Sequence, residues 1–330
     1  MTDYPGTRGG WRRRQVQAKW QNLIAIFITV ILLFAVFNGL LRGFSQDLSF
    51  EKSSWVRGSS LVMAVNSSPG SLVIYQDDQK NLALLTFDEE DYFATLGGEI
   101  PIAKLGKVFE KNDKTLAGKV SGALHLPVGH LVLFKERPSA NLENFEDYFK
   151  NFASLLTPFG ILFDYPGDSV AYTNLTRVDL FRLWWGLKSY RVENLIFKDL
   201  GDLGGETILE NGQKVEAVDE QLIARAVSIY LESERLSSER FSVFIKNSSG
   251  IVGVGQLASD LISISGAHVV KIETDSAVSA TSHILAGDTG SFTANYLAKL
   301  VGYDIKAADD QPDDQINVII GRDFVEKYLF

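Results

Sequence analysis

The stretch most informative about the fold is Phe241-Ser242-Val243-Phe244-Ile245, a short run of strand-forming residues. Residues 254–265 follow with helical spacing, and His268-Val269-Val270-Lys271-Ile272 reads as a second strand. Further along, the sequence predicts a strand, a helix and a last buried strand, at residues 282–286, 289–301 and 316–320. Helices that alternate with short apolar strands predict a small α/β layer domain over residues 240–330.

A longer α/β region precedes this domain, over residues 59–200. Three β-rich runs separated by turns predict an antiparallel meander, at residues 61–65, 72–75 and 82–87. Helices are predicted over residues 104–124 and 141–156, and from Thr176 to residue 185 with Asp179 in the capping-box position.

The two domains are joined by a predicted connector at residues 201–239. Its first part, residues 201–215, is rich in glycine and is predicted to form turns. Residues 217–231 are predicted to be helical, and residues 232–240 to be a charged linker.

An uncharged apolar run lies near the N-terminus, at residues 23–37, and only Thr29 interrupts it. With its flanks, the segment 20–42 has about the ~20 residues that a helix needs to cross a bilayer. A cleaved signal peptide has a shorter apolar core, about 7–15 residues, and a small-x-small cleavage site. The run here is longer and leads into a poor cleavage sequence, so a transmembrane signal-anchor helix is predicted at residues 20–42.

Charge predicts the orientation of this helix. Basic residues crowd its N-terminal side: Arg12, Arg13, Arg14 and Lys19. By the positive-inside rule residues 1–19 form a cytoplasmic tail, and everything after residue 42 is extracytoplasmic. The sequence therefore predicts a single-pass cell-membrane protein, with a stalk at residues 43–58 and two exported α/β domains.

Composition excludes several classes of function. Residues 1–42 contribute +5 to the net charge of −9, so the remainder carries −14, and a surface that acidic repels nucleic acid and anionic lipid. The chain has no cysteine, which excludes disulfides, thiolate nucleophiles and cysteine-ligated metal. Its four histidines are scattered without a zinc-ligand spacing, and no Gly-x-Ser-x-Gly elbow is present.

Three stretches of the second domain carry a family resemblance. They are Val243-Phe244-Ile245-Lys246-Asn247-Ser248-Ser249-Gly250, Gly255-Gln256-Leu257-Ala258 and Ile316-Asn317-Val318-Ile319-Ile320-Gly321-Arg322-Asp323-Phe324. Together they resemble the C-terminal domain that follows LytR-CpsA-Psr proteins of the bacterial envelope. Residues 59–200 more faintly resemble the LytR-CpsA-Psr domain itself, at residues 84–87, 104–124, 126–132 and 172–176.

The resemblance implies a chemistry that this chain departs from. Active members of the family transfer glycopolymers from polyprenyl pyrophosphate carriers to peptidoglycan, with arginines on the pyrophosphate and aspartates on a divalent cation. Where the family has Arg-x-Asp and Pro-Arg-Asp, this chain has Ser68-Pro69-Gly70 and Asp88-Glu89-Glu90, and residues 163–173 lack the later Arg-x-Arg. Glu89 would then face the pyrophosphate, where like charges cost several kcal/mol at an effective dielectric near ~20. A degenerate, non-catalytic domain is expected.

Two further patterns have ordinary structural interpretations. The acidic run 88–91 could hold a hard cation, but a solvated turn is favoured because four consecutive acids do not converge on one ion. Residues 253–258 match Gly-x-Gly-x-x-Ala, but residues 246–252 separate the first glycine from the strand, so helix entry and close packing are favoured over dinucleotide binding.

Five residues are the candidate binding residues: Trp184, Trp185, Asn247, Gly250 and Gly255. The two tryptophans, with Tyr190, could form a sugar-stacking platform, although their helical spacing favours core packing. The other three lie in the stretches that resemble the LytR C-terminal domain. No catalytic, cofactor-binding or metal-ligating residue is predicted, and no cofactor.

The expected function is a non-catalytic envelope scaffold or a wall-glycan-binding protein, with membrane, peptidoglycan or wall glycopolymer as partners. One alternative is an active phosphotransferase, for which Lys104 and Lys107 are the only expected nearby cations. Another is an assembly partner of a second envelope protein. Whether the helix at residues 145–156 encloses a lipid tunnel is left open.

Overall fold

The structure is a computed structural model. It describes residues 52–77, 79, 81–94, 102–110, 113–188, 190–191, 194–201, 203–209, 212–308 and 311–329. The predicted tail and membrane-spanning segment, and most of the predicted stalk, lie outside these residues. Among the helices that are described, none combines the length and the apolar character needed to cross a bilayer.

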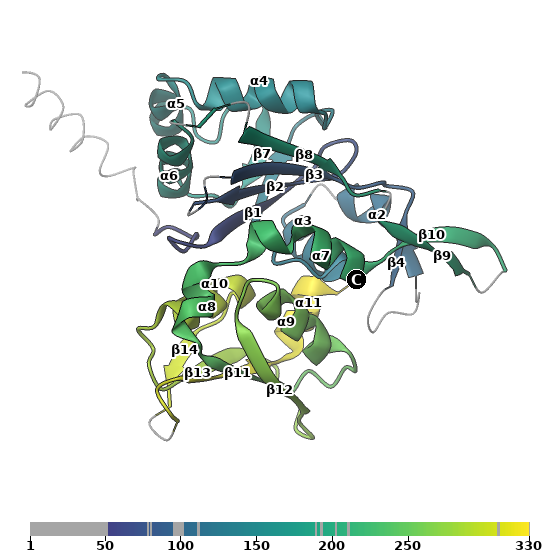
Figure 1. Ribbon diagram of the computed structural model, residues 1–330, viewed down its shortest axis with the longest axis vertical. Coiled ribbons are helices and arrows are strands. Elements are labelled where there is room, and N and C mark those ends of the chain that lie inside the picture. Colours follow the sequence, from purple (N-terminus) through teal and green to yellow (C-terminus); the bar gives the residue numbers. More distant parts are fainter. Residues whose placement is uncertain are drawn as a thin grey trace, which may run out of the picture. The chain divides into compact units, whose positions relative to one another are not determined.

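Six strands form the first sheet: β1 (Ser60–Val65), β2 (Ser71–Gln76), β3 (Asn81–Thr86), β6 (His130–Phe134), β7 (Val170–Thr173) and β8 (Leu195–Asp199). Their order is β7-β6-β1-β2-β3-β8 (Figure 1). The predicted meander is confirmed, because β1 pairs antiparallel with β2 and β2 with β3. β6 and β8 pair parallel with β1 and β3.

Helices cover both faces of this sheet: α3 (Leu116–Leu124) and α7 (Glu220–Leu231) on one, and α4 (Leu142–Phe152), α5 (Thr157–Phe163) and α6 (Arg177–Leu187) on the other (Figure 1). Val62 and Ala64 of β1 belong to the core with α3 and α7, while Leu61 and Met63 belong to the core with α4 and α6. Burial on both faces explains why β1 to β3 are apolar at nearly every position. The first domain is thus a three-layer α/β/α unit.

The single helix predicted at residues 104–124 is wrong. The segment contains β5 (Ile102–Lys104), α2 (Gly106–Phe109) and α3. α3 starts after a local turn in which Asp113 Oδ1 accepts hydrogen bonds from the backbone N–H and hydroxyl of Thr115, at 2.8 and 2.6 Å. Short polar side chains offer the backbone such turns in place of a continuous helix.

The connector at residues 201–239 is more ordered than the sequence predicts. β9 (Gly204–Ile208) and β10 (Lys214–Val218) form a hairpin, which joins β4 (Tyr92–Ala94) and β5 in a second sheet of order β5-β4-β10-β9. The predicted helix begins at Glu220 rather than residue 217, because Asp219 caps the N–H groups of Gln221 and Leu222. The expected linker contains α8 (Glu234–Glu239).

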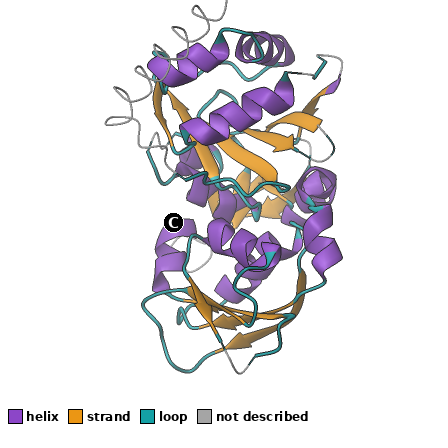
Figure 2. Cartoon of the chain, turned by 90° about the vertical axis from the view of Figure 1, so that its left-hand side faces the viewer, coloured by secondary structure: helices purple, strands orange, loops and turns teal. Residues whose placement is uncertain are grey.

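The C-terminal domain is a two-layer unit. Its sheet has the order β12-β11-β15-β13-β14, with β11 (Ser242–Asn247), β12 (His268–Thr274), β13 (His283–Ala286), β14 (Ile305–Ala307) and β15 (Gln315–Ile320). Three helices pack on one face (Figure 2): α9 (Val254–Ser263), α10 (Phe292–Val301) and α11 (Arg322–Tyr328). The alternation of apolar strands and helices predicted for this domain is confirmed, while β14 and α11 were not predicted.

The two domains touch through α3 and α11. Gly118 and Gly122 of α3 lie so close to α11 that an added Cβ would meet the carbonyl oxygens of Lys327 and Tyr328. Only glycine permits this approach of the two backbones.

The chain enters the first domain through residues 52–59, here called the N-terminal strap. Trp55 of the strap is 3% exposed and packs edge-on against Tyr75, with ring centroids 5.6 Å apart. Arg182 of α6 donates to Ser53 Oγ and to the carbonyl of Trp55, both at 2.8 Å, and its guanidinium lies 4.3 Å from the Trp55 ring centroid. Lys299 of α10 donates to the carbonyl of Ser53 at 2.7 Å. The strap thereby joins α6 to the C-terminal domain.

A buried carboxylate organises the strap. Asp179 of α6, fully buried, accepts six hydrogen bonds from Ser53, Ser54, Trp55 and Thr176. Desolvation alone would raise the pKa of Asp179, but the hydrogen bonds from Ser53, Ser54 and Thr176 outweigh it and lower that pKa. Thr176 and Asp179 form the predicted capping box, which is confirmed.

His130 of β6 lies beside this carboxylate. Its Nε2 is 3.1 Å from Ser54 Oγ, which in turn donates to Asp179 at 2.7 Å. Burial lowers the pKa of His130 to about 4, and Lys299 acts in the same direction, while the nearby Asp179 charge opposes it. His130 is therefore neutral in the folded protein at every pH above about 4.

This burial predicts a specific acid sensitivity. The unfolded chain binds a proton at His130 near pH 6.5, whereas the folded chain does not until about pH 4, so stability falls as pH drops through this window. At 1.36 kcal/mol per pKa unit the loss approaches roughly 3 kcal/mol. We expect His130→Gln to lose less stability between pH 7 and pH 4.5 than the parent, measured by urea unfolding.

The exposed His268→Gln variant is the matched control and should keep the parent's pH dependence. Equal slopes for the parent and the His130→Gln variant would contradict the prediction. Protonation of Asp179, whose pKa is lowered, removes stability only at more acidic pH and leaves this window unaffected.

Candidate lipid pocket

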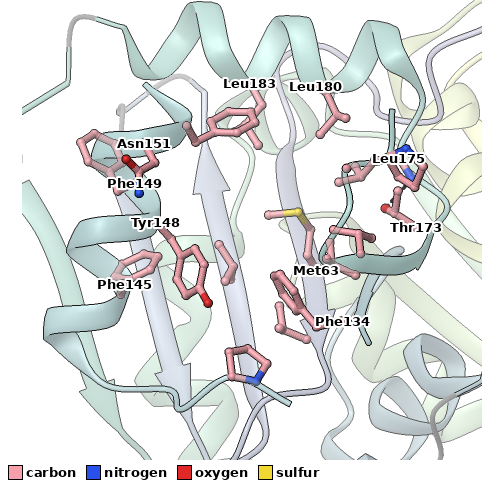
Figure 3. A pocket seen from close by; sticks show the side chains of 18 of the residues that line it. Met63, Phe134, Phe145, Tyr148, Phe149, Asn151, Thr173, Leu175, Leu180 and Leu183 are labelled. Atoms are coloured by element: carbon pink, nitrogen blue, oxygen red, sulfur yellow. Dashed lines mark hydrogen bonds between the residues drawn. The ribbon is translucent and has the colours of Figure 1, made fainter. Parts of the chain in front are cut away.

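A cavity of about 640 Å³ lies between the first sheet and the helices α4, α5 and α6. Figure 3 shows side chains from the strands, from α4 and from α6 pointing into the cavity. The cavity is open to solvent along part of its length, and its lining is mainly aliphatic and aromatic. Its apolar lining includes Met63, Leu84, Val132, Phe145, Phe149 and Leu183.

The periodicities of the strands and of α4 direct these side chains into the cavity. Met63 and Leu84 occupy positions of β1 and β3 that face the second helix layer, as strand alternation requires. Phe145 and Phe149 stand four residues apart on α4 and project from one face of the helix. Asn141 starts α4 by accepting a hydrogen bond from the N–H of Asn144 at 2.8 Å, which fixes where that face begins.

One end of the cavity is polar. It is lined by Ser67 after β1, Ser71 at the start of β2, and Ser139 in the loop after β6. The hydroxyls of Ser67 and Ser71 lie 2.5 Å apart. These residues follow or precede paired strands, so they gather at the same edge of the sheet.

An arginine outside the cavity lining is bonded to Ser67 at this polar end. Arg137 Nε donates to the carbonyl of Ser67 at 3.1 Å, and its Nη2 donates to the same carbonyl and to Glu89 Oε1. Nearby, Lys104 is paired with Glu90. The expectation that Lys104 and Lys107 are the only cations here is wrong, because Arg137 reaches this region from a loop far away in sequence. Its positive charge is nevertheless balanced by Glu89.

The acidic run 88–91 is thus distributed among separate partners. Glu89 binds Arg137, Glu90 binds Lys104, and Asp91 is 4% exposed. Within the described part of the chain, no group of three histidine, aspartate or glutamate side chains could hold a metal ion. Glu89 and Glu90 thus form ion pairs with two different side chains, and the carboxylates of this turn do not converge on one point.

Ser54, His130 and Asp179 contain the residue types of a hydrolytic triad in the wrong order. In a triad the histidine lies between the serine and the carboxylate, whereas Ser54 here lies between His130 and Asp179. The hydroxyl proton is directed to Asp179, so His130 is not placed to accept it. The set holds the strap and does not form a nucleophile.

The two candidate tryptophans have different environments. Trp184 is 9% exposed, and its Nε1 donates to the carbonyl of Ser154 at 2.8 Å. Trp185 is 70% exposed. Tyr190 packs on Phe149 and donates to the carbonyl of Asn194, on the cavity side of α6. The structure therefore does not bring the three rings into one platform.

The C-terminal candidates lie in and on either side of one loop, between β11 and α9. Asn247, 4% exposed at the end of β11, donates to the carbonyl of Ile251 and accepts from the N–H and hydroxyl of Ser249. Gly250 in the loop has φ +79°, a conformation that favours glycine. A Cβ on Gly255, in the first turn of α9, would lie 2.9 Å from Ile272 Cγ2, so this glycine allows α9 to pack on the sheet. All three residues have a structural role.

The open face of the C-terminal sheet carries a second, smaller hollow of about 230 Å³. Phe244 lies at its base, with Gln315 and Asn317 of β15 alongside. Its lysines are paired, since Lys246 binds Asp275 and Lys271 binds Glu273. Its volume is below the about 300 Å³ at which small-molecule pockets usually begin.

The sequence left open whether the helix at residues 145–156 encloses a tunnel, and the structure shows a cavity beneath it. Phe145, Phe149 and Phe152 have helical spacing, but that spacing is the same for a helix that closes on a sheet and for one that leaves space beneath it. Arg137 carried no local signal, because its partner Glu89 is 48 residues away.

Comparison with known proteins supports the C-terminal assignment. Residues 240–324 match the family model described as LytR cell envelope-related transcriptional attenuator. No curated protein matches the chain.

Solved structures that are similar to part of the chain include three proteins. Lin1025 of Listeria innocua is 13% identical with a TM-score of 0.35, covering 53% of this chain and 97% of that one. TagV of Bacillus subtilis is 11% identical with a TM-score of 0.36, covering 52% and 95%. The LytR-CPS2A-psr family protein YwtF (TagT), solved with bound octaprenyl pyrophosphate lipid, is 14% identical with a TM-score of 0.33, covering 54% and 90%.

The family model and the alternating strands and helices of residues 240–324 agree, and this part of the chain is a LytR C-terminal domain.

Proposed function

We propose that this chain is a cell-envelope protein that holds the hydrocarbon chain of a polyprenyl-type lipid in the cavity of its first domain, without transferring the head group. The cavity carries this proposal. Its volume, about 640 Å³, falls within the about 300–1,000 Å³ of small-molecule sites, and it is lined mainly by apolar side chains. An elongated hydrocarbon gains from burial in such a space in proportion to the apolar area removed from water.

The charges at the polar end argue against catalysis. Holding a pyrophosphate through its reaction requires cations that are free to bind its oxygens. Arg137 is engaged by Glu89 and Lys104 by Glu90, so these two cations already have carboxylate partners. A phosphotransferase of the LytR-CpsA-Psr type would have to displace Glu89 to recruit Arg137.

The scaffold and wall-glycan functions expected from the sequence are compatible with this proposal. A lipid held by the first domain would leave the LytR C-terminal domain available for a wall polymer or for another envelope protein. The proposal places both domains on the outer face of the cell membrane, downstream of the signal-anchor helix predicted at residues 20–42.

Filling the cavity should abolish lipid binding. Val132 lies in the middle of β6 and lines the cavity, so Val132→Trp adds an indole to the space that the hydrocarbon needs. We expect at least a tenfold loss of labelling by a photoactivatable polyprenyl pyrophosphate, measured on the full chain in lipid vesicles by mass spectrometry of cross-linked peptides.

The matched control is Val252→Trp, which adds the same side chain at a position 91% exposed. It should label as the parent does. Undiminished labelling of α4 to α6 peptides in a folded Val132→Trp variant would overturn the assignment of the cavity.

Releasing Arg137 from its partner should change the head-group preference. Glu89→Gln removes the carboxylate that neutralises Arg137, so the pyrophosphate form should gain roughly tenfold over the uncharged polyprenol, about 1.4 kcal/mol. Competition between the two lipids in the cross-linking assay measures this ratio.

Arg137→Gln serves as the counterpart and should bring no such gain. An unchanged ratio in Glu89→Gln would show that the ion pair does not control the head group. Transfer of the head group to a wall acceptor by the parent protein would contradict the non-catalytic proposal.

A further inference from the structure

Four large apolar side chains lie exposed around the loop between α4 and α5 and on α6. Leu155, Leu156, Phe159 and Trp185 are 71%, 74%, 60% and 70% exposed. We call them the exposed apolar patch. Single exposed apolar residues are common, but a contiguous group of large ones marks a surface that binds something.

The members of the patch belong to one surface. The carbonyl of Ser154 accepts a hydrogen bond from Trp184 Nε1 at 2.8 Å, which fixes the loop before Leu155 against α6. The ring of Trp185 lies edge-on to that of Trp184, with centroids 6.1 Å apart. α5, which carries Phe159, packs against α6, which carries Trp185 (Figure 1).

The patch is not part of the cavity lining, although it adjoins it. Residues of the same segment that line the cavity are Phe152, Thr157, Gly160 and Ile161, whereas Leu155, Leu156 and Phe159 are exposed between them. The loop thus has an inner side toward the cavity and an outer side toward solvent. Core packing does not explain the outer side.

Charge around the patch suits a phospholipid surface. Lys188 Nζ lies 5.5 Å from the ring centroids of both Trp184 and Trp185, and Arg191 nearby is exposed. Tryptophan with flanking lysine and arginine is the composition of protein segments at the membrane–water interface. Basic side chains add an attraction to anionic lipids.

Chain length favours the same partner. The predicted membrane-spanning segment ends at residue 42, and Ser53 is held on α6 by Asp179 and Arg182. Eleven residues span at most about 40 Å when fully extended. A membrane-spanning segment at residues 20–42 would therefore tether α6 within about 40 Å of the bilayer.

We propose that the exposed apolar patch inserts into the head-group region of the outer leaflet of the membrane, and so holds the cavity against the lipid surface. Contact of the patch with the bilayer does not require an occupied cavity. That the contact supplies the cavity with lipid rests on the proposed function.

The absence of cysteine from the chain allows a clean test. The full chain carrying Leu156→Cys is labelled with an environment-sensitive dye and reconstituted into vesicles of phosphatidylcholine and phosphatidylglycerol. We expect a blue-shifted emission and quenching by nitroxide-labelled lipids at least threefold stronger than for the dye at Ile208→Cys. Ile208 is 64% exposed on β9 and is the matched control.

Two results would overturn the proposal. One is water-like emission with equal quenching at both positions. The other is a blue shift that grows with protein density and is insensitive to the nitroxide lipids, which would assign the patch to a second copy of the chain.

Repeating the measurement in the Val132→Trp background separates this proposal from the proposed function. Unchanged dye quenching together with lost cross-linking supports both assignments independently. Loss of quenching in that background would mean that the dye reports lipid in the cavity, and it would overturn membrane insertion of the patch.

Discussion

The buried carboxylate of Asp179 is the constraint on which the arrangement of the first domain depends. A buried charge is tolerated only when its hydrogen-bonding capacity is filled, and Asp179 accepts six hydrogen bonds. Two of these hydrogen bonds come from Thr176 at the start of its own helix, and four come from the strap. If α6 and the strap moved apart, the buried carboxylate would lose those four hydrogen bonds. Because α6 forms one wall of the cavity, the same interaction fixes the cavity and the point at which the chain enters the domain.

The cavity follows from how the second helix layer sits on the sheet. On the opposite face, α3 and α7 close on small and branched residues such as Ala64 and Ala83, and the core there is continuous. On this face Met63 and Leu84 of the sheet and the aromatic residues of α4 belong to one cluster, and the cavity lies among them. A layer that packed to ordinary interior density would leave no such volume, so the space costs packing energy.

Local patterns predicted much of the fold but little of the site. The meander, the capping box at Thr176 and the alternation in the C-terminal domain were predicted because each depends on residues close in sequence. The break before α3 was missed because one Asp113–Thr115 turn outweighs the apolar spacing on either side. The cavity and the Arg137–Glu89 pair depend on elements brought together from distant parts of the chain, and periodicity alone cannot distinguish a closed layer from an open one.

The Arg137–Glu89 ion pair changes the expected effect of Glu89 on phosphate binding. From the sequence, Glu89 was expected to repel a pyrophosphate directly; in the structure its carboxylate faces Arg137. The obstacle to phosphate binding is then competition for one guanidinium, not uncompensated repulsion. Glu89 is an intramolecular anion held at Arg137, and its effective concentration there exceeds that of a free ligand. The ion pair therefore disfavours an anionic ligand at Arg137, and neither of its two side chains lines the apolar cavity.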